Sequence, residues 1–125
     1  MSLDAIGIIS KDIAKSITFY ALLGVDLKGL GHGHYEGTTS SGVRIMLDSV
    51  EVMKSLNPQW QPPVGCGIVL CFKQPAAAKV DELFARITGA GFTAIKTPWD
   101  AFWGQRYASV QDPDGNQIDL FADIS

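Results

Sequence analysis

Asp112-Pro113-Asp114-Gly115-Asn116, followed by Gln117-Ile118-Asp119-Leu120-Phe121, is the stretch that decides the fold of this 125-residue chain. The proline fixes φ for the first half of a tight turn, and the glycine after an aspartate supplies the positive φ that closes it. Residues 107–110 and 117–122 have the composition of strands, so the segment is predicted to be a β-hairpin. Asp119 then lies in mid-strand, on the opposite face from Ile118 and Leu120.

The composition predicts one compact cytoplasmic domain. Hydrophobic residues make up 46% of the chain and charged residues 18%, which is typical of a globular protein on the apolar side. The net charge of −3 and the lack of a basic cluster argue against nucleic acid as a partner. Residues 68–72, the longest apolar run, are too short to span a membrane, and the chain does not begin with a signal-peptide pattern. Cys66 and Cys71 are expected on opposite faces of one strand, where they cannot bridge each other, and two free thiols fit a reducing compartment.

The sequence has two halves with the same order of elements, β-α-β-β-β. In the first half, residues 5–9, 25–30, 34–39 and 43–48 resemble strands, around a helix that Asp12 caps and Gly24 ends. In the second half the corresponding strands are residues 67–72, 92–96, 105–111 and 117–122, around an amphipathic helix at residues 76–88. Residues 49–64 form a proline-containing connector with room for a short helix at about residues 50–56. We therefore expect an α+β fold, with residues 1–125 as a single domain. Its two βαβββ modules, at about residues 3–48 and 65–123, would pair mixed, curved sheets around a crevice, with the helices outside.

A duplicated βαβββ unit with a terminal Asp-Pro-Asp-Gly-Asn hairpin resembles the vicinal oxygen chelate superfamily. That superfamily contains glyoxalase I, extradiol dioxygenases, fosfomycin-resistance enzymes and bleomycin-resistance proteins. The resemblance covers essentially the whole chain, and its other matching stretches are residues 3–8, 15–20, 23–24, 80–83 and 103–106. It implies a homodimer whose subunits share their crevices.

The catalytic members of this superfamily bind a metal ion through one residue on each of four strands. In this chain those positions fall on Ala5, Met46, Val69 and Asp119. Alanine and valine offer no donor atom, and a thioether favours soft metals. One carboxylate is not a catalytic metal site, so no metal cofactor is expected at these four positions. The glyoxalase and fosfomycin-transferase mechanisms need that ion as a Lewis acid.

The two histidines lie outside these four positions. His32, His34 and Glu36 alternate along a possible strand, so they could share one face and bind a metal ion. The alternative is a glycine-rich loop or strand edge that simply carries polar residues, and short motifs of this kind are common by chance.

The crevice is expected to bind a planar or aromatic small molecule. Trp99, Phe102 and Trp103 cluster in the segment between the sixth and seventh predicted strands, where such rings can stack on a flat ligand. The same rings could instead cap the core or enter a dimer interface. The apolar lining expected from the faces of the strands adds Met46, Val69 and Phe121.

Three charged residues are candidates for polar anchoring: Asp119, Arg44 and Arg106. Arg106 can hold an anionic group with two hydrogen bonds, or it can pair with Asp112 or Asp114 across the hairpin. Arg44 can pair with Asp48, or with Asp119, which would then be structural.

These observations favour a metal-independent binding protein, closest to the bleomycin-resistance-like branch, that sequesters its ligand without chemistry. The alternative is a lyase or isomerase in which Asp119 is the general base, with or without a non-standard metal site. Cys71 faces inward by strand parity, but no histidine is placed to deprotonate it, so it is expected to be a small apolar filler.

Overall fold

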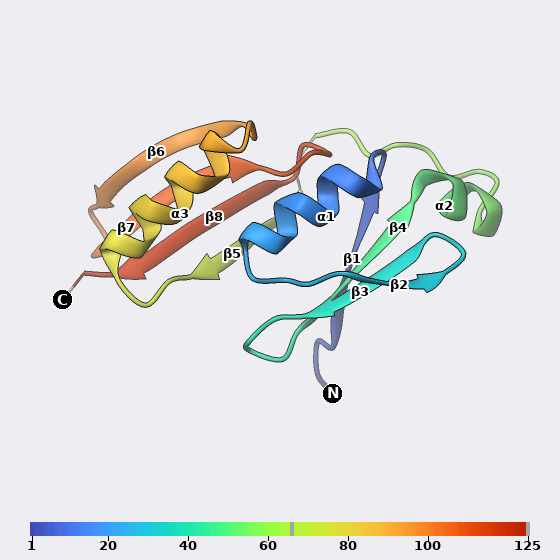
Figure 1. Cartoon of the computed structure of the whole chain (residues 1–125), viewed down its shortest axis with the longest axis horizontal. Helices are drawn as coiled ribbons and strands as arrows, with labels where there is room; N and C mark the ends of the chain where they lie inside the picture. Colours follow the sequence, from blue (N-terminus) through green and yellow to red (C-terminus); the bar gives the residue numbers. More distant parts are fainter. Residues whose placement is uncertain (66, 125) are drawn as a thin grey trace. The chain divides into compact units, whose positions relative to one another are not determined.

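The computed structural model describes residues 1–65 and 67–124, and the chain divides into two compact units, Met1–Val64 and Gly65–Ser125 (Figure 1). The expectation for Cys66 lies outside the described residues. The elements of the first unit are β1 (Ala5–Ser10), α1 (Ile13–Leu22), β2 (Lys28–Gly31), β3 (His34–Thr38), β4 (Arg44–Ser49) and α2 (Val50–Leu56). Those of the second are β5 (Val69–Lys73), α3 (Ala77–Gly89), β6 (Ala94–Ala101), β7 (Gln105–Gln111) and β8 (Gln117–Asp123).

Each unit contains a four-stranded mixed sheet with the same topology. The strand orders are β1-β4-β3-β2 and β5-β8-β7-β6. The pairs β1–β4 and β5–β8 are parallel, and the remaining pairs are antiparallel. The structure confirms the predicted α+β class and the two βαβββ modules.

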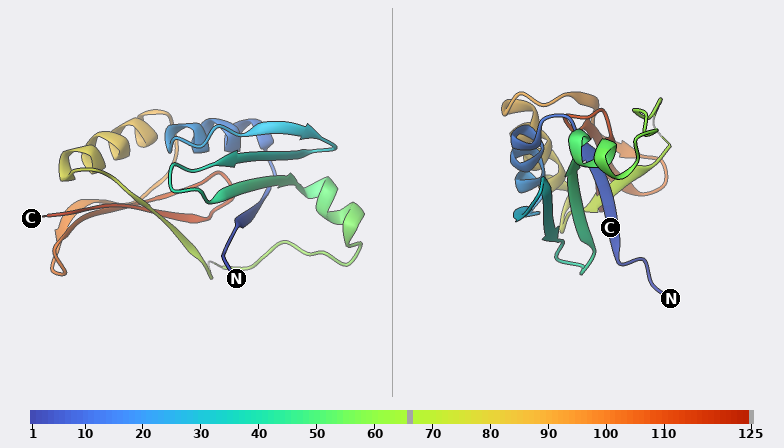
Figure 2. Two further views of the ribbon diagram at one scale, coloured as in Figure 1. Left: turned by 90° about the horizontal axis from the view of Figure 1, so that it is seen from below. Right: turned by 90° about the vertical axis from the view of Figure 1, so that its right-hand side faces the viewer.

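One long helix covers one face of each sheet, as the views in Figure 2 show for α1 and α3. Strand alternation sends Ile45 and Leu47 of β4 to this helix face, where both are buried. In the second unit Ile118 and Leu120 of β8 are likewise buried, and α3 contributes the buried Val80, Leu83 and Ile87. We call the other face of each sheet, away from its own helix, the open face.

The terminal hairpin forms as predicted, and Asp112 organises it. The side chain of Asp112 is 4% exposed and accepts hydrogen bonds from the backbone N–H groups of Asp114 and Asn116, at 2.9 and 2.8 Å. Gly115 has φ of +86°, the left-handed conformation that glycine adopts without strain. The turn fixes the register of β7 and β8, so that Ser109 lies opposite Asp119.

The helices agree with the sequence better than the strands do. Asp12 caps α1 by accepting from the backbone N–H of Lys15, and α2 occupies residues 50–56 as expected. Strand β2 begins at Lys28 and not at residue 25, since the buried Val25 and Leu27 fill the core before any ladder forms. Strand β5 begins two residues later than predicted, at Val69.

Strand β6 is longer than predicted and includes Trp99, which was expected in the following segment. Its register with β7 shifts twice, and the second shift, between Lys96 and Trp99, spans Pro98, as suits an edge strand that contains a proline. The longest helix of the described residues, α3, has 13 residues, and no helix among those residues could cross a membrane.

Candidate functional site

The open face of the second sheet carries a buried carboxylate, Asp119, in the middle of β8. Its side chain is 6% exposed. Gln117 and Phe121 share its face of β8, and the ladders add Cys71 of β5 and Ser109 of β7 as its direct cross-strand neighbours. Asp119 therefore has a cross-strand neighbour on each side, one on β5 and one on β7.

Three side chains donate hydrogen bonds to Asp119. Tyr107 donates its phenolic hydrogen to Oδ2 at 2.6 Å. Ser109 and Gln117 donate to Oδ1, at 2.7 and 2.9 Å. Three donors directed at one carboxyl group are the pattern expected for an ionised carboxylate, which only accepts. The Asp119 carboxylate is thus held by its own strand and by β7.

Aromatic rings surround this polar group on the same sheet. Tyr107 stacks on Phe121, with ring centroids 6.1 Å apart, and meets Trp103 edge to face at 5.3 Å. Trp103 also packs edge to face against Trp99 at 5.5 Å. These four residues, which we call the aromatic cluster, combine flat apolar surface with one phenolic hydroxyl.

A chain of polar contacts orients Trp103. Its indole N–H donates to Gln105 Oε1 at 2.9 Å, and Gln105 Nε2 donates to Asp123 at 3.0 Å. Lys73 pairs with the same carboxylate at 3.2 Å. Trp103 is 48% exposed, and this chain of hydrogen bonds adds to its ring contacts in holding the indole.

The other candidates of the second unit are arranged differently. Val69 of β5, 39% exposed, and the exposed Cys71 lie on the open face, whereas Phe102 is 91% exposed in the turn after β6. Arg106 alternates with Tyr107 and so lies on the helix face. It donates two hydrogen bonds to Asp81 of α3, at 3.0 and 3.3 Å, and one to Asp100 at 3.1 Å.

Arg106 therefore pairs with neither Asp112 nor Asp114, contrary to one expectation. It is on the opposite face of the sheet from Asp119. Strand alternation accounts for this position. Ala108 and Val110 lie on the same side of β7 as Arg106 and are fully buried, so this side is the helix face.

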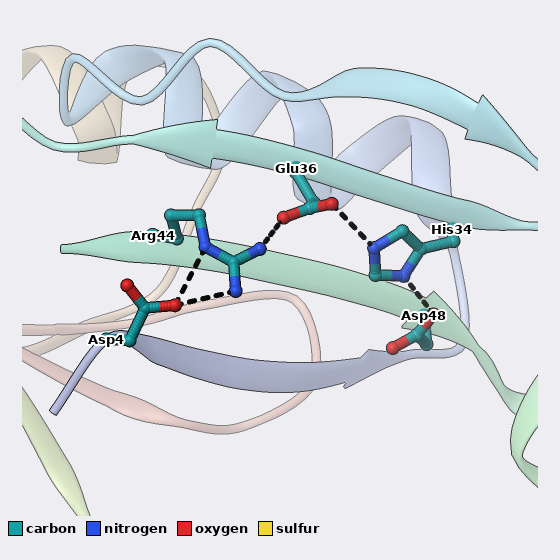
Figure 3. Close-up of polar contacts among 5 residues, drawn as sticks. All are labelled: Asp4, His34, Glu36, Arg44 and Asp48. Atoms are coloured by element: carbon teal, nitrogen blue, oxygen red, sulfur yellow. Dashed lines mark hydrogen bonds and ion pairs between the residues drawn. The ribbon is translucent and has the colours of Figure 1, made fainter.

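The open face of the first sheet carries a chain of charged groups, shown in Figure 3. Arg44 donates to Asp4 at 2.8 and 3.1 Å and to Glu36. His34 lies between Glu36, at 3.2 Å from Nε2, and Asp48, at 2.6 Å from Nδ1. Arg44 thus pairs with Asp4 and Glu36, and not with Asp48 as one alternative proposed.

The surroundings of His34 favour its protonated form. The hydrogen bond to Asp48 raises the pKa of His34, and the bond to Glu36 adds to this effect. The hydrogen bond from His34 lowers the pKa of Glu36 in turn, with a further contribution from Arg44. An imidazolium with both N–H groups engaged is neither a general base nor a metal ligand.

A metal site built from His32, His34 and Glu36 does not form. His32 lies in the turn between β2 and β3 with φ of +55°, so it does not alternate along the strand with the other two residues. Within residues 1–65 and 67–124, no group of three or more histidine, cysteine, aspartate or glutamate side chains could hold a metal ion.

The four positions that the resemblance implies for metal ligands correspond to one another in pairs, one pair in each sheet. Ala5 pairs with Arg44, two residues before Met46, and Val69 pairs with Gln117, two residues before Asp119. The registers of the two sheets therefore make Ala5 correspond to Val69, and Met46 to Asp119. Only Asp119 supplies an oxygen, and its carboxylate already accepts three hydrogen bonds.

Sequence reasoning missed Tyr107 and Ser109 as partners of Asp119. The signal was present in the hairpin, because the turn at residues 112–116 sets the register of β7 on β8. Counting back from that turn pairs Ser109 with Asp119 and Tyr107 with Phe121.

Comparisons with known proteins agree with this architecture. The family model described as the Glyoxalase/Bleomycin resistance protein/Dioxygenase superfamily matches residues 2–120. The comparison with curated protein sequences gives no significant match.

Several solved structures share the fold. A glyoxalase/bleomycin resistance protein/dioxygenase family enzyme from Burkholderia phytofirmans PsJN is 21% identical with a TM-score of 0.88, over 99% of this chain and 100% of that one. A glyoxalase-related enzyme from Fulvimarina pelagi is 18% identical with a TM-score of 0.83, over 98% and 88% of the two chains. A lactoylglutathione lyase from Agrobacterium tumefaciens is 17% identical with a TM-score of 0.73, over 97% and 92%.

Proposed function

This chain belongs to the glyoxalase/bleomycin resistance protein/dioxygenase superfamily, and from that premise we propose that it binds a planar or aromatic small molecule without a metal ion. The binding surface is the open face of the second sheet, over the aromatic cluster and Val69. The ligand is sequestered and not transformed, as in the bleomycin-resistance-like branch.

The observation that carries this proposal is the aromatic cluster beside a carboxylate whose hydrogen bonds are satisfied within the protein. Trp103 and Val69 are 48% and 39% exposed, so they offer apolar surface to a ligand. Trp103 is held in place by Gln105, which lowers the entropic cost of ordering the ring when a ligand binds. Stacking on such rings needs contact area and no reaction.

The enzymatic alternative, with Asp119 as general base of a lyase or isomerase, has less support. A general base needs a free lone pair within reach of the proton that it removes. Asp119 is 6% exposed, and three donors within its own sheet use three of the four lone pairs of its two oxygens, so little of the carboxylate is left for a substrate proton. The geometry suits a carboxylate that orients its neighbours.

We also propose that the protein is a homodimer, as the family resemblance suggests. Large apolar side chains of the second unit are exposed, among them Ile95 at 45% and Phe102 at 91%. Exposed apolar surface of this kind is common at sites of association. Light scattering coupled to size-exclusion chromatography tests this: a single species of 27 kDa, twice the 13.5 kDa of one chain, is expected, and a 13.5 kDa species at all concentrations contradicts it.

Tryptophan fluorescence tests the binding function directly. The chain has three tryptophans, of which Trp99 and Trp103 belong to the proposed site and Trp60 to the connector. Titration with a panel of planar antibiotics and aromatic metabolites is expected to give a saturable change in emission. Trp99→Ala and Trp103→Ala should weaken binding, and Trp60→Phe, the matched control, should leave it unchanged.

Four outcomes contradict the proposal or a part of it. If no compound changes the emission, or if both alanine variants bind as the parent does, the surface is wrong. A stoichiometric transition metal in the purified protein contradicts the metal-independent part. Turnover of a bound compound that Asp119→Asn abolishes while binding persists favours the enzyme.

A further inference from the structure

The hydroxyl group of Tyr107, in the aromatic cluster, has its hydrogen-bonding direction fixed by Asp119. Its hydrogen is donated to Asp119 Oδ2 at 2.6 Å. A phenol has one hydrogen to donate and two lone pairs to accept with. The Oη atom of Tyr107 therefore meets other groups only as an acceptor.

Asp119 keeps the hydrogen in this position. Its other oxygen, Oδ1, already accepts from Ser109 and Gln117. If the Tyr107 hydroxyl turned toward a ligand, Oδ2 would lose the donor at 2.6 Å on a carboxylate that is 6% exposed. A buried charged acceptor without its partner is costly, so the rotation is disfavoured.

The ionisation state of the phenol agrees with this geometry. Burial raises the pKa of Tyr107, and the hydrogen bond to Asp119 raises it further. The phenol therefore keeps its proton at physiological pH, and a phenolate is not what a ligand meets.

Among the described residues, the only other polar atom within hydrogen-bonding distance of Tyr107 Oη is a weak partner. Cys71 Sγ lies 4.0 Å away, at the limit for a hydrogen bond to sulfur, and Cys71 is exposed. Since the phenolic hydrogen is used, the thiol can only be the donor, and thiols donate weakly. A stronger donor on a ligand can take its place.

We propose that Tyr107 is a specificity-determining residue of this site, and that the ligand is a planar molecule bearing a hydroxyl, N–H or ammonium group that donates to Tyr107 Oη. This inference rests on the proposed function, because it concerns the same surface. A ligand that has only a carbonyl, ether or carboxylate oxygen next to Tyr107 Oη cannot form this hydrogen bond, because both oxygens are acceptors. Asp119, Ser109 and Gln117 are positioning residues: together they keep the Tyr107 hydrogen on Asp119, so that Oη acts as an acceptor.

Matched probes separate the donor from charge and shape. We suggest 2-naphthalenemethanol with its methyl ether, and 2-naphthylmethylammonium with its N-trimethyl derivative. Each pair keeps ring and charge and differs in the donor hydrogen. Binding is followed by two-dimensional NMR of the ¹⁵N-labelled full chain, through the indole N–H signals of Trp99 and Trp103, with Trp60 as internal control.

The donor-bearing probe of each pair is expected to bind about threefold to tenfold more tightly than its methylated partner, which is the usual worth of one hydrogen bond. In Tyr107→Phe this ratio should fall to within about twofold of one. Tyr35→Phe, a tyrosine of β3 in the other unit, should keep the full ratio. The affinity ratio of each probe pair is compared between the parent and the variant, so the effect of the extra bulk of the methyl groups on affinity cancels.

The outcomes distinguish the two proposals. Equal binding of donor and methylated probes to the parent protein overturns the role of Tyr107 while leaving the aromatic surface in place. An unchanged ratio in a folded Tyr107→Phe variant does the same. If none of the four probes shifts the indole signals of Trp99 or Trp103, the binding function itself fails, and with it this inference. If Tyr107→Phe does not fold, equal binding of the paired probes to the parent protein still overturns the role of Tyr107.

Discussion

Removal of the Ser109 hydroxyl tests whether Asp119 is an ionised acceptor held by its sheet. In Ser109→Ala the carboxylate loses the donor at 2.7 Å, and both side chains are 6% exposed, so water cannot readily replace it. A hydrogen bond to a charged group contributes about 1.5–3 kcal/mol. We expect the free energy of unfolding to fall by about 2 kcal/mol, because Gln117 still donates to the same oxygen.

Urea unfolding followed by tryptophan fluorescence measures this loss in the relevant unit. Trp99 and Trp103 report on the second unit, and a Trp60→Phe background removes the signal of the first. For a chain of this length about 4 °C accompanies each kcal/mol, so the melting temperature should fall by about 8 °C. Ser41→Ala, in the first unit, is the control and is followed by far-ultraviolet circular dichroism, which reports on both units: its hydroxyl is exposed and bonded to Thr39 at 3.0 Å, and a change of less than about 0.5 kcal/mol is expected. If Ser109→Ala and Ser41→Ala are equally stable, Asp119 is not held as we describe.

Three further predictions concern stability. Because the pKa of His34 is raised above its ordinary 6.5, its stabilising charge is present below that pH and is lost as the pH rises through the higher folded-state value. The parent should therefore exceed His34→Gln in urea stability by more at pH 5.5 than at pH 9, and parallel pH profiles would contradict this. Gly37→Ala should cost about 1–3 kcal/mol, since a Cβ there would lie 2.6 Å from the Asp26 carbonyl oxygen, whereas Gly67→Ala, with open space, should be near neutral in the same assay. Asp112→Ala should lower the free energy of unfolding by about 2–4 kcal/mol, because two backbone N–H groups of the hairpin lose their acceptor. A loss below about 1 kcal/mol in calorimetry would contradict the role of Asp112 in organising the turn.

The sequence was sufficient for the fold because local signals and the repeat agree. The Asp-Pro-Asp-Gly-Asn turn favours one low-energy backbone conformation, which the hydrogen bonds of Asp112 and the positive φ of Gly115 show. Strand parity then placed Asp119 on the open face, away from Ile118 and Leu120. The same alternation places Arg106 on the helix face, a consequence that the prediction from sequence did not include.

The partners of the charged residues could be predicted only in part. Ser109 and Tyr107 follow from the register that the hairpin sets, so they were within reach of the sequence. The pairing of Arg106 with Asp81 depends on how α3 is rotated and placed over the sheet. That placement is a result of core packing, and no local pattern encodes it.

Corresponding positions of the two sheets show why the motif does not specify the chemistry. By register, the pair His34–Asp48 of the first sheet corresponds to Tyr107–Phe121 of the second. In the first sheet the position carries an imidazole whose two nitrogens are both engaged by carboxylates. In the second it carries a phenol that has given its hydrogen to Asp119 and keeps its lone pairs. The same backbone therefore satisfies its polar groups internally in one half and leaves an acceptor among aromatic rings in the other. The cross-strand neighbours of Asp119 therefore decide which atoms of this face still have a hydrogen or a lone pair available for a further hydrogen bond.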